Sequence, residues 1–121
     1  MTTPMRNPEF IYKIASGAAF AAAHDAGTFT GMPIDLADGF VHFATASQLP
    51  ETLSLHFRGE ANLVLFAVRS FDVGRDLRWE PSRDGKLFPH VYGTFPMSII
   101  AWSAPISVAA DGSCRLPEAV T

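Results

Sequence analysis

The chain has 121 residues, of which 48% are hydrophobic and 17% are charged. This size and balance predict one globular domain and exclude a disordered chain. Nine basic residues against twelve acidic ones leave a net charge of −3. That balance argues against general DNA or RNA binding, which needs a basic face, but it leaves room for a small anionic ligand or a nucleotide.

Neither a disulfide nor a membrane partner is expected. The one cysteine, Cys114, cannot form an intramolecular disulfide, which favours a reducing, cytoplasmic compartment. No apolar run approaches the ~20 residues of a membrane helix. The alanine-rich stretch 15–23 loosely resembles a signal peptide, but cleavage after it would remove the apolar segment 10–14, so export is not expected.

The beginning of the chain predicts a strand followed by a helix. Residues 1–9 are expected to form a loose lead-in to a single domain over 10–121. The apolar segment 10–14 predicts the first strand. Ser16 is a suitable N-cap for a helix that ends at Gly27, where a glycine can adopt the left-handed conformation.

A loop, a second strand and a second helix are predicted next. Glycine, proline and polar residues predict a loop over 27–38, and the following residues predict a strand over 40–44. Ser47 is a plausible cap for a helix over 48–57. Its expected buried stripe consists of residues four apart, Leu49, Leu53 and Phe57.

The rest of the chain predicts strands. The continuous apolar run 63–68 is typical of a strand covered on both faces. Segments 77–80 and 87–92 flank Asp84-Gly85, which predicts a hairpin. Two further strands are expected over 99–102 and 106–109. Helices early in the chain and strands late in it predict an α+β fold with two helices and a mainly antiparallel sheet.

Candidate site residues are polar side chains within apolar strands. His42 lies between Val41 and Phe43 and must be hydrogen-bonded or line a cleft, because burying an unpaired imidazole is costly. Thr45 and Ser47 follow at the strand-to-helix junction, where they serve as caps or help to hold an anion. Lys13 in the first strand is either an edge lysine reaching water or a cation facing a phosphate or carboxylate.

The hairpin carries the second group of candidates, Arg78, Glu80, His90 and Tyr92. With a two-residue turn, Glu80 and His90 fall on opposite faces, and a slip of one residue reverses this. His90 and Tyr92 share a face in either register and suit a ring-binding pocket. Glu80 is either a surface carboxylate or a catalytic one.

Three stretches together resemble the family called domain of unknown function 952. They are Ile11-Tyr12-Lys13-Ile14, Asp38-Gly39-Phe40-Val41-His42-Phe43-Ala44-Thr45, and Leu77-Arg78-Trp79-Glu80-Pro81-Ser82 with Leu87-Phe88-Pro89-His90-Val91-Tyr92-Gly93. The resemblance covers residues 10–103. It implies similarity to the ADP-ribosyltransferase fold, a split sheet whose cleft binds NAD in many members.

The RNA 2′-phosphotransferase branch of that superfamily is the nearer likeness. Its His-apolar-apolar-Ser/Thr strand resembles the stretch from His42 to Thr45. Its aromatic-His-Gly-Thr motif is altered here, since Lys13 stands where that motif has histidine. The likeness implies that Glu80 would steady a cationic ribose.

Two functional hypotheses follow. In the first, the protein is an enzyme acting on NAD or an ADP-ribose-like nucleotide, with His42 and Glu80 as catalytic residues. Its ligand-binding residues would be Lys13, Thr45, Ser47, Arg78, His90 and Tyr92. In the second, the same scaffold is a non-catalytic module that binds a small ligand or a protein. No Cys-x-x-Cys or His-Glu-x-x-His motif is present, so no metal site is expected.

Overall fold

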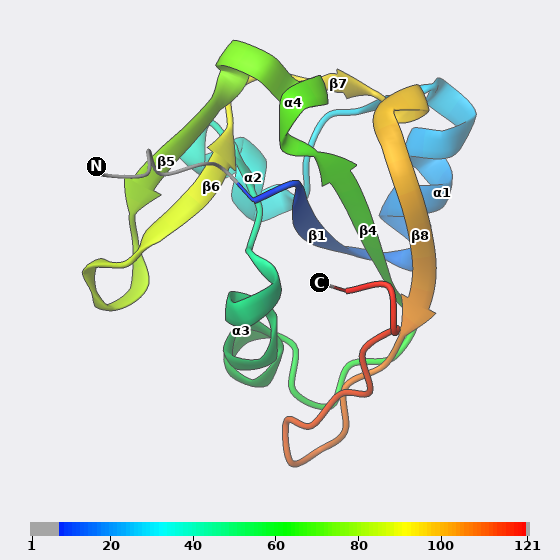
Figure 1. Ribbon diagram of the computed structural model, residues 1–121. Coiled ribbons are helices and arrows are strands. Elements are labelled where there is room, and N and C mark those ends of the chain that lie inside the picture. Colours follow the sequence, from blue (N-terminus) through cyan, green and yellow to red (C-terminus); the bar gives the residue numbers. More distant parts are fainter. Residues whose placement is uncertain (1–7, 121) are drawn as a thin grey trace.

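Two three-stranded antiparallel sheets form the framework of the computed structural model, which describes residues 8–120 (Figure 1). The first sheet has the strand order β1 (Phe10–Ser16), β4 (Leu63–Arg69), β8 (Ile100–Ile106). The second has the order β3 (Val41–His42), β6 (Leu87–Val91), β5 (Leu77–Pro81). A short ladder joins β2 (Thr28–Phe29) to β7 (Phe95–Pro96). The predicted α+β class with antiparallel strands is therefore confirmed.

The two larger sheets meet at a single isolated bridge, between Tyr12 of β1 and Ala44, which follows β3. Each residue donates its backbone N–H to the carbonyl oxygen of the other, and both N···O distances are 2.9 Å. Figure 1 shows the β5–β6 hairpin extending to one side of this junction and β4 and β8 lying on the other.

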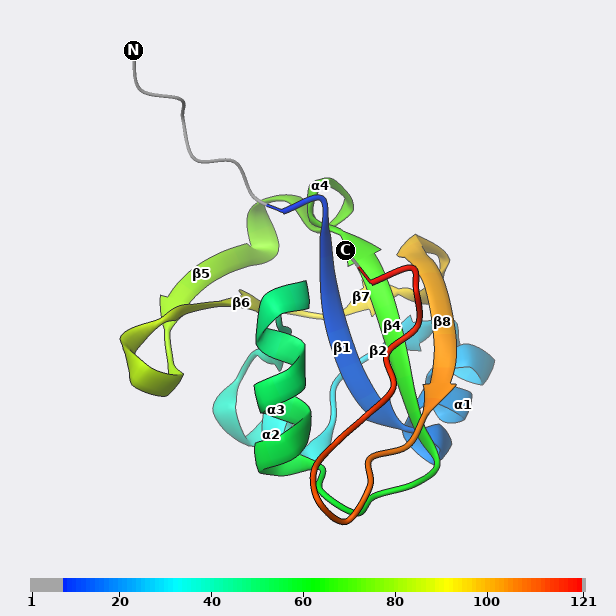
Figure 2. The same cartoon turned by 60° about the horizontal axis from the view of Figure 1, so that its bottom comes forward.

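The β1–β4 pair is buried on both faces, as the apolar run 63–68 predicts. One face packs against α1 (Gly17–Ala26) through an aromatic cluster that includes Phe66. The other face packs against Leu49 and Leu53 of α3 (Leu49–His56) and against the C-terminal segment. Figure 2 shows that segment, in red, crossing in front of β4. The central sheet therefore separates two hydrophobic cores.

The first helix agrees with the prediction at both ends. The side chain of Ser16 accepts a hydrogen bond from the backbone N–H of Ala19 at 3.1 Å. Gly27 adopts the left-handed conformation with φ 80° and donates its N–H to the carbonyl of Ala23. These groups satisfy polar atoms that the first and last turns of a helix leave unpaired.

The predicted loop over 27–38 is wrong, because it contains β2 and the helix α2 (Pro33–Asp38). Pro33 begins the helix, where its missing N–H costs no hydrogen bond, and Gly39 ends it in the left-handed conformation with φ 86°. With α4 (Ser70–Val73), the described part of the chain has four α-helices rather than the two predicted.

The predicted strand over 40–44 is shorter in the structure, because the chain changes partners within it. His42 pairs with His90 of β6, and Phe43 still donates its N–H to the carbonyl of Pro89. Ala44 pairs instead with Tyr12 on the other sheet. This segment therefore brings the second sheet to the edge of the first.

Thr45, rather than Ser47, is the cap of the following helical segment. Its hydroxyl accepts the N–H of Gln48 at 3.3 Å, and the Gln48 side chain accepts the N–H of Thr45 at 3.0 Å. This reciprocal pair precedes a short 3-10 helix, Ala46–Gln48, that leads into α3.

We expect Thr45→Ala to lower the free energy of unfolding by about 1 kcal/mol, since it removes a capping acceptor. Ser47→Ala is the matched control, and we expect it to cost less than half as much, because its exposed hydroxyl contacts only that of Thr45, at 3.2 Å. Urea denaturation of both variants checks this. Equal losses would contradict the assignment of the cap.

The hairpin register differs by one residue from the one that a two-residue turn implies. Arg78 pairs with His90, Trp79 with Pro89, and Glu80 with Phe88. The connection includes a 3-10 turn over Arg83–Gly85, and Ser82 donates its N–H to the carbonyl of Lys86. The prediction that Glu80 and His90 lie on opposite faces is therefore wrong.

The predicted strand 99–102 lies largely within β8, whereas the separate strand predicted over 106–109 is wrong, because β8 ends at Ile106 and residues 107–109 form no strand. Residues 1–7 of the predicted lead-in lie outside the described residues. Among residues 8–120, no helix is long and apolar enough to cross a membrane.

Candidate functional site

Asp35 of α2 is the centre of a buried polar network. Its carboxylate accepts the Nζ of Lys13 at 3.0 Å on one oxygen and lies 2.9 Å from it on the other. The backbone N–H groups of Met32 and His42 also donate to it, at 2.6 and 3.0 Å. The Asp35 side chain is 1% exposed and that of Lys13 is 5% exposed. The network thus ties β1, α2 and β3 together.

The electrostatics of this pair follow from burial and charge. Burial lowers the pKa of Lys13, and the Asp35 carboxylate partly opposes that shift. Burial alone would raise the pKa of Asp35, but the hydrogen bonds from His42 and the charge of Lys13 outweigh it and lower that pKa to about 2. Asp35 is therefore ionised at neutral pH.

His42 lies between two carboxylates. Its Nδ1 is 2.7 Å from Asp35 Oδ1, and its Nε2 is 3.0 Å from Asp38 Oδ2. Asp38 is exposed, whereas Asp35 is buried. Asp35 therefore fixes the orientation of the ring, and Asp38 holds its outer nitrogen at the protein surface.

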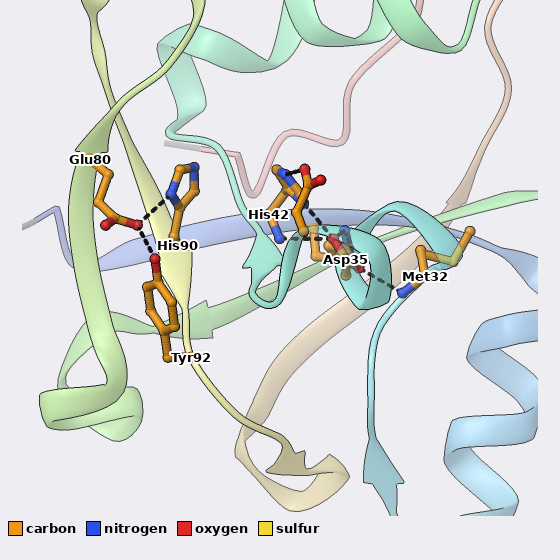
Figure 3. Close-up of polar contacts among 8 residues, drawn as sticks. Met32, Asp35, His42, Glu80, His90 and Tyr92 are labelled. Carbon is orange, nitrogen blue, oxygen red and sulfur yellow. Dashed lines mark hydrogen bonds and ion pairs between the residues drawn. The ribbon is translucent and has the colours of Figure 1, made fainter.

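A second carboxylate–histidine pair lies on the hairpin. Glu80 Oε1 is 2.8 Å from His90 Nδ1 and accepts the hydroxyl of Tyr92 at 2.7 Å (Figure 3). Arg78 lies over the Tyr92 ring, 5.2 Å from its centroid. The hydrogen bond from His90, followed by that from Tyr92, lowers the pKa of Glu80. The same bond to Glu80 raises the pKa of Tyr92.

Phe40 connects the two pairs. Its ring stacks on His90 with centroids 4.1 Å apart and lies 4.6 Å from the His42 ring. The two imidazole rings are 5.5 Å apart, centroid to centroid, and meet edge to face. Figure 3 shows both histidines between their carboxylates, with Glu80 and Asp35 on the outer sides. Two oriented imidazoles are therefore adjacent.

Both histidines line a pocket of about 640 Å³ at the junction of the two sheets. Residues of β1, α2, α3 and the hairpin form its walls. Aromatic side chains supply much of the lining, among them Phe43, Phe57 and Phe88. An apolar pocket with a few convergent polar groups is the usual form of a small-molecule site.

The structure brings some of the predicted site residues together and separates others. Lys13, His42 and His90 line the pocket. Arg78, Glu80 and Tyr92 lie outside its lining but are joined to it through His90. Thr45 and Ser47 also lie outside the lining, at the start of the 3-10 helix. Lys13 is not the water-reaching edge lysine considered above, because Asp35 pairs with it in the interior.

Sequence reasoning missed Asp35 and Phe40, and also Arg83 at the pocket wall. Arg83 pairs with Glu51 of α3 at 3.2 Å and lies over the Phe88 ring. Pro33 followed by an acidic residue in the first turn, with Gly39 at the end, is a helix signature that could have revealed α2. Nothing local indicated that Asp35 contacts Lys13, 22 residues earlier.

No cluster of three or more histidine, cysteine, aspartate or glutamate side chains within residues 8–120 is arranged to hold a metal ion. His42 and His90 each have their Nδ1 on a carboxylate. Such a pair can hold, donate or accept a proton at the opposite ring nitrogen.

Three solved structures that are similar to this chain are of the protein CC0527 from Caulobacter crescentus. Its crystal structure is 45% identical in sequence, covers 88% of this chain and 93% of that chain, and has a TM-score of 0.83. Its solution NMR structure is 46% identical, covers 87% and 90% of the two chains, and has a TM-score of 0.77. No curated protein matches the chain. The family model described as "Protein of unknown function (DUF952)" matches residues 14–103, and the chain belongs to this family.

Proposed function

We propose that the protein binds a small nucleotide of the NAD or ADP-ribose class in the pocket between its two sheets. The observation that carries the proposal is the pocket itself. It combines a volume of about 640 Å³, aromatic walls and two carboxylate-oriented histidines. That volume lies within the range of pockets that bury drug-sized ligands.

The lining suggests how such a ligand would be held. Phe57 and Phe88 offer apolar surface for a base or a pyridine ring. The Arg83 side chain is 20% exposed, and His56 is exposed at the end of α3. A guanidinium such as that of Arg83 suits a phosphate. Lys13 is not available for that role unless the ligand competes with Asp35, which already neutralises it.

The arrangement of the strands also supports an ADP-ribosyltransferase-like relationship, which we include in the proposal. The two sheets share one bridge and diverge beside the pocket, as the cleft of a split sheet requires. In this reading, the enzyme would break the bond between nicotinamide and ribose through a cationic sugar. Ionised carboxylates near that sugar would lower the barrier.

Glu80 takes part indirectly in this proposal. Its carboxylate is outside the pocket lining and bonds His90 and Tyr92. The cationic ribose would therefore meet His90 first, with the charge of Glu80 behind it. Once the ligand displaces Asp38, His42 would donate a hydrogen bond from its Nε2 to the ligand.

Thermal unfolding with NAD, ADP-ribose, AMP and nicotinamide tests the proposal. A ligand at 100 times its Kd should raise Tm by about 5 °C or more. His42→Asn should abolish the rise. His24→Asn is the matched control, since His24 is 77% exposed and outside the pocket lining. No shift with any nucleotide, together with unchanged amide NMR spectra of the pocket residues, would contradict the proposal.

The second candidate is a non-catalytic module that binds a small ligand or a protein. Two facts favour it: Glu80 lies outside the lining, and Asp35 neutralises Lys13. Measurement of nicotinamide release from NAD separates the two candidates. Stabilisation with release supports the enzyme, and stabilisation of an unchanged nucleotide supports the module.

A further inference from the structure

Of the two histidines that face carboxylates in this pocket, His90 differs from His42 in having one ring nitrogen without a partner among the residues that the structure describes. The residue is 4% exposed, and its Nδ1 faces Glu80 at 2.8 Å. Among residues 8–120, no hydrogen-bond partner is found for its Nε2. Figure 3 shows the second ring nitrogen on the far side of the ring from Glu80, and His90 is part of the pocket lining.

The hydrogen bonds decide which nitrogen carries the proton. An ionised carboxylate only accepts, so His90 must donate from Nδ1 to Glu80. A neutral imidazole has one N–H, and its Nε2 is then left with a lone pair. His42 is different, because both of its nitrogens face carboxylate oxygens, Asp35 at 2.7 Å and Asp38 at 3.0 Å.

The ring of His90 is also fixed in direction. Phe40 stacks on one of its faces with an interplanar angle of 22°. The carboxylate that holds its Nδ1 is itself held by the Tyr92 hydroxyl at 2.7 Å. A group that takes a proton from a ligand needs this kind of fixed geometry.

We infer that His90 is the proton acceptor of this pocket, acting at Nε2, and that Glu80 and Tyr92 are positioning residues that set its tautomer and direction. The inference rests on the proposed function for its substrate. The proton comes from an O–H group, either water or a hydroxyl of an acceptor molecule. The positive charge that forms on the ring is stabilised by Glu80.

On an NAD-type nucleotide, the reaction would transfer the ribose carbon from nicotinamide to the oxygen of the acceptor. The O–H bond of the acceptor breaks and its proton passes to Nε2 of His90. The oxygen forms a bond to the anomeric carbon of the ribose. The bond from that carbon to the pyridinium nitrogen breaks, and its electron pair leaves with nicotinamide, which departs as a neutral molecule. No oxidant or reductant is needed.

The tautomer can be measured without any ligand. Long-range 1H–15N NMR spectra of the ring nitrogens in the free, full-length protein should show a proton on His90 Nδ1 and none on Nε2. Tyr92→Phe and Glu80→Gln should weaken this preference, and Glu80→Gln should do so more. A proton on Nε2 in the native protein would overturn the inference whether or not a nucleotide binds.

Kinetics provide the second measurement. If NAD is cleaved, His90→Gln should lower kcat for nicotinamide release about 10²–10⁴-fold. Glu80→Gln should lower kcat by at least about tenfold with KM unchanged, whereas His24→Gln should change neither. Retention of kcat by His90→Gln overturns the inference but leaves nucleotide binding intact. Absence of nucleotide binding refutes the proposed function, and the tautomer measurement then decides the inference alone.

Discussion

Replacing Asp35 with asparagine is expected to lower the free energy of unfolding by about 3–5 kcal/mol, because it leaves the Lys13 ammonium buried without a counter-charge. The side chain of Asp35 is 1% exposed, and its two oxygens contact Lys13, His42 and two backbone N–H groups. An amide offers only one oxygen acceptor to these donors. Urea denaturation followed by circular dichroism measures the loss.

Asp38→Asn is the matched control for this substitution. Asp38 also contacts His42, at 3.0 Å, but its side chain is 44% exposed, so we expect a loss of about 1 kcal/mol or less. The double variant Lys13→Met with Asp35→Leu should recover part of the loss. Recovery is incomplete, since the N–H groups of Met32 and His42 lose their acceptor. Equal effects of the two single asparagine variants would contradict a buried counter-charge.

Acid is expected to remove about 2 kcal/mol of stability through the same carboxyl. The pKa of Asp35 is lowered from 3.8 to about 2 in the folded protein, and each unit corresponds to about 1.4 kcal/mol. Because the pKa of Asp35 is lower in the folded protein, its ionised carboxyl stabilises the fold at pH values above 3.8, the pKa in the unfolded chain. That contribution disappears as the pH falls toward 2.

The native protein and Asp35→Asn should be compared by urea denaturation between pH 5 and about pH 2. Because the variant has no carboxyl at this position, the difference between the two proteins should narrow by about 2 kcal/mol over that window. The other carboxyl groups titrate in both proteins, so their contributions to the free energy of unfolding cancel in the comparison. A difference that stays constant with pH would show that the charge of Asp35 does not stabilise the fold.

Local signals in the sequence were sufficient for much of the framework. The cap at Ser16 and the glycine at 27 predict α1, and the stripe of Leu49 and Leu53 predicts α3. The continuous apolar run of β4 predicts burial on both faces. These features depend on residues close together in the chain, which is why a single sequence reveals them.

The candidate site was harder to predict, because it depends on distant contacts and on register. A shift of one residue in the hairpin moves Glu80 to the side of His90. The hairpin connection that causes the shift is an irregular turn with Asp84 at φ 57°. An Asp-Gly pair is compatible with more than one turn, so it does not determine this register. Two alternatives stayed open for Lys13, an edge lysine reaching water or a cation facing a carboxylate or phosphate. Its partner Asp35 lies in α2, within the segment 27–38 whose glycines and proline predict a loop.

The two sheets, joined by the bridge between Tyr12 and Ala44, form two blocks whose facing side chains also pack in one shared core. Each sheet satisfies its own ladder of hydrogen bonds, so separating the blocks breaks only two backbone bonds there, each contributing about 1 kcal/mol. Contacts of Asp35, the pair Arg83–Glu51 and the packing of Val41, Phe43 and Val91 against Ile11 and Phe66 also hold the two sheets together. The pocket lies at the junction of the two sheets, so a ligand bound there would contact side chains from both of them.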